Sequence, residues 1–289
     1  MPITPDENPS MVDLDTKTHV RVGPYILTRE LTPGAMGSRH LALHALDNSS
    51  HVVHLLPTGR DRYGQRRFLA AMAHAESLAK AVAPTPGGQH ILRIEDHGLD
   101  TRGQAWVVTP FTGDARGIVS LEAHLREKGG FLPAFEAREA LVHLCQAVAA
   151  AHAAGFAHGE LHTESVVVDR RGSLLIEGYG VPLLLRDGLE AMSDESIRRA
   201  EVRSIARIAY RLVTGLLPEE PIIPAGRVVT GLDPWWDAWL DTALYSEPGF
   251  RSSAHALSAI ADRSIGEYPS PRSRSGVRSV IRRFLFAGV

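Results

Sequence analysis

The stretch His158-Gly159-Glu160-Leu161-His162-Thr163-Glu164-Ser165 decides the fold, together with Ile176-Glu177-Gly178-Tyr179-Gly180 further along the chain. Gly155 ends a predicted helix just before the first stretch, and the β-branched run 166–168 follows it. The first stretch is therefore predicted to be a loop and not part of a helix. Two short strands, near 165–168 and 174–176, are expected around a turn at 169–172.

On either side of these loops, the chain divides into a β-rich first half and a helical second half. Apolar runs and turn signals predict strands within 22–57 and at 91–94 and 105–109, with one helix at 65–83. Beyond Phe111 the apolar spacing predicts helices at 120–128, 134–154, 195–214, 233–245 and 252–261. The predicted divisions are a disordered leader at 1–20, an N-terminal lobe at 21–110, a C-terminal lobe at 111–262 and a basic tail at 263–289.

The composition is that of a globular protein. Of 289 residues, 44% are hydrophobic and 22% are charged, which excludes wholesale disorder. The formal net charge of −2 provides no general attraction for nucleic acid, so no such partner is expected. A single cysteine, Cys145, excludes a disulfide framework and a multi-cysteine zinc site. No stretch has the pattern of a signal peptide or a membrane span, which predicts a soluble, cytoplasmic protein.

Further segments stand in a fixed order around the two loops. The turn Leu31-Thr32-Pro33-Gly34-Ala35-Met36-Gly37 separates two predicted strands, and His54 lies in the next strand, 17 residues after Gly37. Gly178 lies 13 residues after Ser165. Downstream of it come the segments 191–195, 201–206, 214–218 and 250–254.

In this order and spacing, the segments resemble the motifs of the bacterial Ser/Thr protein kinase family over residues 22–262. Residues 31–37 are similar to the glycine-rich loop, 51–57 to the V-A-I-K strand, 158–165 to H-R-D-L-K-P-E-N and 176–180 to I-D-F-G. The resemblance implies a two-lobed, protein kinase-like α+β fold. It also implies a degenerate nucleotide site, whose candidate residues are Thr32, Gly34, Gly37 and His54.

The same resemblance indicates which phosphate-binding groups are replaced. His54 stands in place of the lysine that pairs with the nucleotide phosphates. The helix glutamate that would hold this lysine corresponds to Ala71, or to Glu76 on a different face of the helix. Thr32 replaces the first glycine of the loop, and Gly159 replaces the arginine beside the catalytic position.

The catalytic and metal-binding positions are altered as well. Glu160 stands in place of the catalytic aspartate, one methylene longer, and is the candidate base if any activity remains. The two positions that hold magnesium are Ser165 and Gly178, so no metal site is expected. Strand alternation predicts that Glu177 points to the opposite side from Gly178.

These substitutions predict a pseudokinase that acts as a scaffold or allosteric regulator in bacterial Ser/Thr kinase signalling, with a signalling protein or an active kinase as partner. No cofactor is required by this interpretation; binding of ATP without Mg²⁺ is an open alternative. The rival function is a divergent, active kinase or other ATP-dependent transferase that uses Glu160 as its base.

Three other features carry weaker interpretations. His158, Glu160 and His162 have a spacing used by zinc sites on helices, but they lie on a predicted loop and lack a glutamate directly after the first histidine. Cys145 is expected to be buried and inert. The cluster of Trp235, Trp236 and Trp239 is interpreted as core packing, with an exposed partner patch as the alternative.

The tail has a composition of its own. Six arginines and a single acid, Glu267, lie between Arg263 and Arg283, and 277–286 reads as a short basic amphipathic helix. Segment 270–289 is therefore a candidate contact with an anionic membrane or an acidic partner. Docking onto the protein's own domain and a solvated tail are the alternatives.

Overall fold

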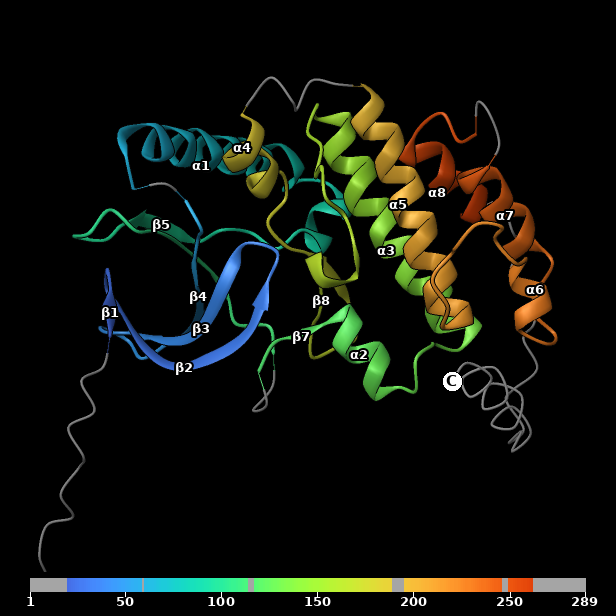
Figure 1. Ribbon diagram of the computed structural model, residues 1–289, viewed down its shortest axis with the longest axis horizontal. Helices are drawn as coiled ribbons and strands as arrows, with labels where there is room; N and C mark the ends of the chain where they lie inside the picture. The colour runs from blue at the N-terminus through green and yellow to red at the C-terminus, as the bar shows by residue number, and fades with distance from the viewer. Residues whose placement is uncertain (1–19, 59, 114–116, 189–194, 246–248, 262–289) are drawn as a thin grey trace, which may run out of the picture.

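The first half of the chain forms an antiparallel sheet with a long helix packed beside it (Figure 1). The strands are β1 (Arg21–Val22), β2 (Tyr25–Gly34), β3 (Gly37–His44), β4 (Ser50–Leu55), β5 (Asp96–Leu99) and β6 (Ala105–Pro110). They pair in the order β1-β2-β3-β4-β6-β5. The strand predicted at 91–94 is wrong: Ile91 makes only an isolated bridge to Ile176, Leu92 donates to the Ile176 carbonyl, and pairing with β6 begins at Asp96.

Helix α1 (Arg62–Val82) forms because a cap and an apolar stripe coincide. The Asp61 side chain accepts a hydrogen bond from the Gly64 N–H at 2.7 Å. Phe68, Ala71 and Met72 follow at helical spacing and are buried. A short 3₁₀ turn, η1 (Pro86–His90), then leads toward β5.

The second half is built on two long helices, α3 (Ala134–Ala153) and α5 (Glu195–Thr214), which pack against each other (Figure 1). Around them lie α2 (Leu121–Glu127), α6 (Ala225–Val228), α7 (Trp235–Leu244) and α8 (Ser253–Ala261). Cys145, Trp236 and Trp239 are buried in the core of this half, so the core interpretation of these residues is confirmed. Gly155, with a φ of 86°, follows α3 at the predicted stop.

The two predicted loops border a small three-stranded sheet. Its strands are β7 (Val119–Ser120), β8 (Val166–Val168) and β9 (Leu174–Ile176), and η2 (Thr163–Ser165) precedes β8. After β9 the chain enters α4 (Val181–Asp187), a helix that the sequence analysis does not predict. Figure 1 shows α4 beside α1, and Arg67 of α1 donates to the Leu185 carbonyl at 3.0 Å. Helix α4 thus ties the two halves together.

The computed structural model describes residues 20–58, 60–113, 117–188, 195–245 and 249–261. Nearly all of the predicted leader and the whole of the basic tail lie outside these residues, as does most of the segment 191–195. Within the described part, the predicted α+β division into a β-rich half and a helical half is confirmed. No helix in these ranges is long and apolar enough to cross a membrane.

Candidate functional site

The turn between β2 and β3 folds inward, toward the boundary between the two halves. Met36 at its tip is 2% exposed and packs in a cluster with Leu56 of the first half, Ala71 of α1 and Val181 of α4. Gly37 has a φ of 119°, and a Cβ there would lie 2.5 Å from the Leu55 carbonyl oxygen. The turn is therefore anchored by its own side chain.

Beneath this turn lies a buried ion pair that connects the two halves. Arg39 of β3 and Glu177, directly after β9, pair through Nη2 and Oε2, with side-chain exposures of 1% and 0%. Burial raises the pKa of Glu177, and the Arg39 guanidinium opposes that shift. A carboxylate of the protein itself thus occupies the underside of the glycine-containing turn.

Arg39 also lies against the backbone of the turn. A Cβ on Gly34 would be 2.0 Å from the Arg39 Cζ, so a larger residue at this position would push the Arg39 guanidinium out of its place. In the motif of the glycine-rich loop, G-x-G-x-x-G-x-V, Arg39 stands at the final, apolar position. The chain therefore places a buried cation where that motif has valine.

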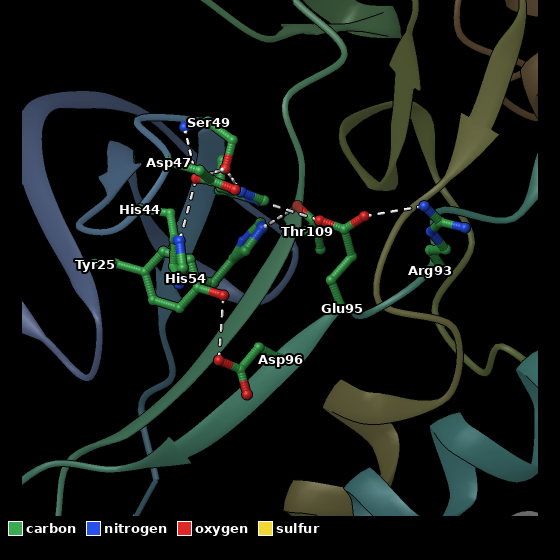
Figure 2. Close-up of polar contacts among 10 residues, drawn as sticks. Tyr25, His44, Asp47, Ser49, His54, Arg93, Glu95, Asp96 and Thr109 are labelled. Carbon is green, nitrogen blue, oxygen red and sulfur yellow. Dashed lines mark hydrogen bonds and ion pairs between the residues drawn. The ribbon is translucent and has the colours of Figure 1, made fainter.

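His54 of β4 lies at the same boundary and is completely buried. Its Nε2 is 3.0 Å from the Thr109 Oγ1 (Figure 2) and 3.8 Å from the Glu177 Oε1. Burial, with Arg39 and His40 nearby, lowers the pKa of His54 to about 3. The imidazole is therefore neutral at pH 7 and supplies no charge for a phosphate.

The predicted direction of Glu177 is wrong. Its carboxylate points toward His54 and Arg39, into the site and not away from it. The alternation rule fails because β9 ends at Ile176 and the chain bends at Gly178, where φ is 68°. A Cβ on Gly178 would lie 2.7 Å from the Met36 Cγ, so the turn tip fills the space that a metal-binding side chain would need.

Ser165, the other position at which magnesium is expected in the family, is bound internally. It is buried, its Oγ donates to the His162 carbonyl at 2.8 Å, and the His162 N–H donates to that oxygen at 3.0 Å. These bonds close the η2 turn. The Ser165 hydroxyl therefore both donates to and accepts from the backbone of His162.

The loop 158–165 is held from below by a carboxylate of α5. Glu201 accepts hydrogen bonds from the N–H groups of His158 and Gly159, at 2.5 and 2.7 Å, and also contacts the His152 Nε2 at 2.7 Å. Gly159 has a φ of 88°, and a Cβ there would lie 2.5 Å from the Leu183 Cδ2. The packing of α4 thus demands glycine where the family has arginine.

Glu160 forms an ion pair with Arg186 of α4, and 37% of its side chain is exposed. Ala71 and Glu76 are the two candidates for the helix position that holds the phosphate lysine in the family. Ala71 is buried in the apolar cluster, and Glu76 is exposed on α1. Thr32 is exposed on β2. The structure therefore brings together Gly34, Gly37, His54 and Gly178, while Glu160 lies apart from them with its own partner.

The loop histidines use their ring nitrogens for local hydrogen bonds. The His158 Nε2 contacts the Glu177 carbonyl at 3.1 Å, and its Nδ1 accepts from the Glu160 N–H at 3.1 Å. The His162 Nδ1 accepts from the Glu164 N–H at 3.2 Å. Across the described ranges, no three histidine, cysteine, aspartate or glutamate side chains are grouped so as to hold a metal ion.

Figure 2 shows a second polar cluster on the first half. The Ser49 Oγ lies 2.7 Å from the His51 Nε2, and the His51 Nδ1 lies 3.1 Å from the Glu95 Oε2. This order suits a nucleophile, a base and an orienting carboxylate. However, the Ser49 hydroxyl donates its proton to Asp47 at 2.6 Å and not to the imidazole. The cluster fastens the turn between β3 and β4 to the edge of the sheet.

The placement of Arg39 and Met36 at the boundary between the two halves is not predicted from the sequence. An arginine after a turn suggests an exposed strand end, and its partner Glu177 is 138 residues away. The one available signal is the presence of a charge at the apolar final position of the loop motif.

Comparisons with known proteins support a kinase-like chain. The kinase domain of PknI from Mycobacterium tuberculosis superposes with a TM-score of 0.61 at 22% identity, covering 84% of this chain and 97% of that one. Its likeness shows the predicted protein kinase-like fold. The sequence is 25% identical to CBL-interacting protein kinase 21 from Oryza sativa subsp. japonica over 177 residues. These residues cover 59% of this chain. That match spans only 31% of the rice protein. No family model matches the sequence.

Proposed function

We propose that this chain is a pseudokinase of the bacterial Ser/Thr protein kinase family, which acts in cytoplasmic signalling as a scaffold or allosteric regulator of a protein partner. The observation that carries the proposal is the buried Arg39–Glu177 pair beneath the glycine-containing turn. The pair fills the site with the protein's own charges.

Phosphoryl transfer depends on positive charge around the transferred phosphate, because catalysis is largely positioning and charge neutralisation. Here the lysine position carries a neutral histidine, His54. The cation that is present, Arg39, is already paired with Glu177. A phosphate that entered this site would meet a buried carboxylate and would have to displace it from Arg39.

The metal positions support the same proposal. Gly178 has no side chain, and Met36 occupies the space in front of it. Without a ligand there, Mg²⁺ has no anchor on this side of the site. Loss of metal and lysine removes the electrostatic contribution, which is usually the largest part of such catalysis.

The rival function, a divergent active transferase, rests on Glu160. Its carboxylate keeps partial exposure and pairs with Arg186, and a carboxylate at this position is the chemical type that serves as a general base. Metal-dependent turnover of ATP would favour this rival.

The test is an assay of ATP turnover and of phosphate transfer to a general protein substrate, with Mg²⁺ and with Mn²⁺. We expect no turnover above a blank without protein, and no difference between the wild-type chain and Glu160→Gln. Turnover that falls at least about 100-fold in Glu160→Gln, the usual contribution of a general base, would overturn the proposal. The substitution Glu219→Gln, at an exposed position beyond the end of α5, is the matched control for loss of a carboxylate.

A further inference from the structure

A groove at the far end of the second half is unused by the site described above. It has a volume of about 420 Å³ and lies between α6 and α7, with Tyr210 of α5 at its base. Its apolar wall includes Ile222, Ile223, Leu240, Leu244 and Tyr245. Ile223 and Tyr245 are 52% and 45% exposed, values that are high for large apolar side chains.

The walls of the groove are fixed by hydrogen bonds. The Tyr210 hydroxyl donates to the Ile223 carbonyl at 2.8 Å, and the Ile222 N–H donates to the Tyr245 hydroxyl at 3.1 Å. A preformed apolar groove of this kind suits an amphipathic helix, since little ordering of the groove is needed on binding.

The rim of the groove is acidic. Asp237 and Asp241 both line it and lie four residues apart on α7, so they face the same side one helical turn apart. Asp237 also accepts from the Gly226 N–H, which holds α6 against α7. The groove therefore favours an apolar helix flanked by cations at the same spacing.

The basic tail carries this pattern. In 277–286, Val277, Val280, Ile281 and Phe284 fall on one helical face, while Arg278 and Arg282 lie beside it one turn apart. The arginine spacing matches that of the two aspartates. Apolar area and charge are both complementary between the groove and the tail.

The tail can reach the groove. The Trp235 Nε1 donates to the Ala259 carbonyl at 3.2 Å, which places the last turn of α8 beside the first residue of α7. The ten residues of α7 span about 15 Å. The 15 residues from 262 to 276 span up to about 50 Å when extended, far more than this distance requires.

We infer that segment 277–286 docks as an amphipathic helix in the groove between α6 and α7 of its own chain, with Arg278 and Arg282 against Asp237 and Asp241. The docked tail covers an apolar groove and withholds its own apolar face from other surfaces.

The test uses the full chain with nitroxide labels on Ser279→Cys and Arg227→Cys, since Cys145 is fully buried and burial raises its thiol pKa. We expect the distances between the two labels to form a single narrow distribution at short range. Amide exchange across 222–245 should be about tenfold slower than in the double variant Arg278→Glu with Arg282→Glu, which corresponds to docking worth about 1.4 kcal/mol. A broad distance distribution, or equal exchange in both chains, would overturn the inference.

Ile223→Arg tests the groove itself, because this exposed side chain can be replaced without disturbing the core. Ile223→Arg should broaden the distribution of distances between the two labels. Leu69→Arg, at a matched exposed position on α1, should leave that distribution unchanged. Co-sedimentation with vesicles of phosphatidylglycerol and phosphatidylcholine distinguishes docking in the groove from binding of the tail to an anionic membrane. If the wild-type chain sediments with these vesicles, and does so as strongly as Ile223→Arg, the tail binds the membrane in preference to the groove and the inference fails.

Discussion

At the scale of single residues, the proposed pseudokinase site is defined by the residues at the positions of the family's catalytic groups. The replacements at His54, Ser165 and Gly178 can be found from the sequence alone, since each stands at a fixed place in a motif. The direction of Glu177 and the burial of Arg39 cannot be found in this way. They depend on the end of β9 at Ile176 and on a contact between residues 138 positions apart, and neither leaves a local pattern.

The buried pair should behave as a unit. Glu177→Ala leaves the Arg39 guanidinium buried without its partner, and we expect a loss of about 3–5 kcal/mol in the free energy of unfolding. Replacement of both residues by apolar side chains, Arg39→Met with Glu177→Leu, should recover most of that loss. Chemical denaturation measures both values. Equal destabilisation by the single and the double variant would contradict the assigned pairing.

At the scale of elements, the long helices and most strands follow from the sequence, because apolar periodicity and caps such as Asp61 are local signals. Helix α4 and strand β5 do not. Helix α4 begins after two glycines in the left-handed region and has only seven residues, too few for periodicity to be detected. The apolar segment 91–94 resembles a strand but contacts β9 instead of β6.

The glycine-containing turn should behave as part of the core. Met36→Ala removes a fully packed side chain from the cluster with α1 and α4, and we expect it to lower the free energy of unfolding by about 2–5 kcal/mol. Leu46→Ala is the matched control, because Leu46 is 88% exposed in the next turn, and it should change stability by less than about 0.5 kcal/mol. Similar effects of the two substitutions would show that the turn does not pack inward.

At the scale of the whole molecule, the division into a β-rich and a helical half could be predicted, while the filling of the boundary between them could not. That boundary is closed by side chains from β3, β4, the turn 34–37 and residue 177, which only the tertiary structure brings together. The result is a kinase-like fold in which the Arg39–Glu177 pair and His54 lie buried at the boundary between the two halves.

Buried neutral histidines in both halves should make the whole molecule sensitive to acid. The pKa of His54 is lowered to about 3, and burial also lowers the pKa values of His74, His143 and His158. The unfolded chain therefore binds more protons below pH 6.5, so stability falls as the pH drops from 6.5 toward 3. Glu177, whose pKa is raised, acts in the opposite sense but is a single group.

We expect the unfolding midpoint to be nearly constant from pH 8 to pH 7 and to fall steadily from pH 6.5 to pH 4.5. The variant His54→Gln should show a smaller fall, because it removes a completely buried histidine whose pKa is lowered to about 3. A midpoint that rises on acidification through this window would be inconsistent with neutral, buried histidines.

We propose that the protein's own charges fill the position at which a kinase would bind nucleotide. The most direct test is the thermal unfolding midpoint of the full chain with and without excess ATP, in Mg²⁺ and in EDTA. A ligand at 100 times its Kd would stabilise the fold by about 2.7 kcal/mol, or roughly 5–10 °C for a domain of this size. We predict no shift in either condition. A rise of that size with ATP, whether or not it needs Mg²⁺, would contradict the claim.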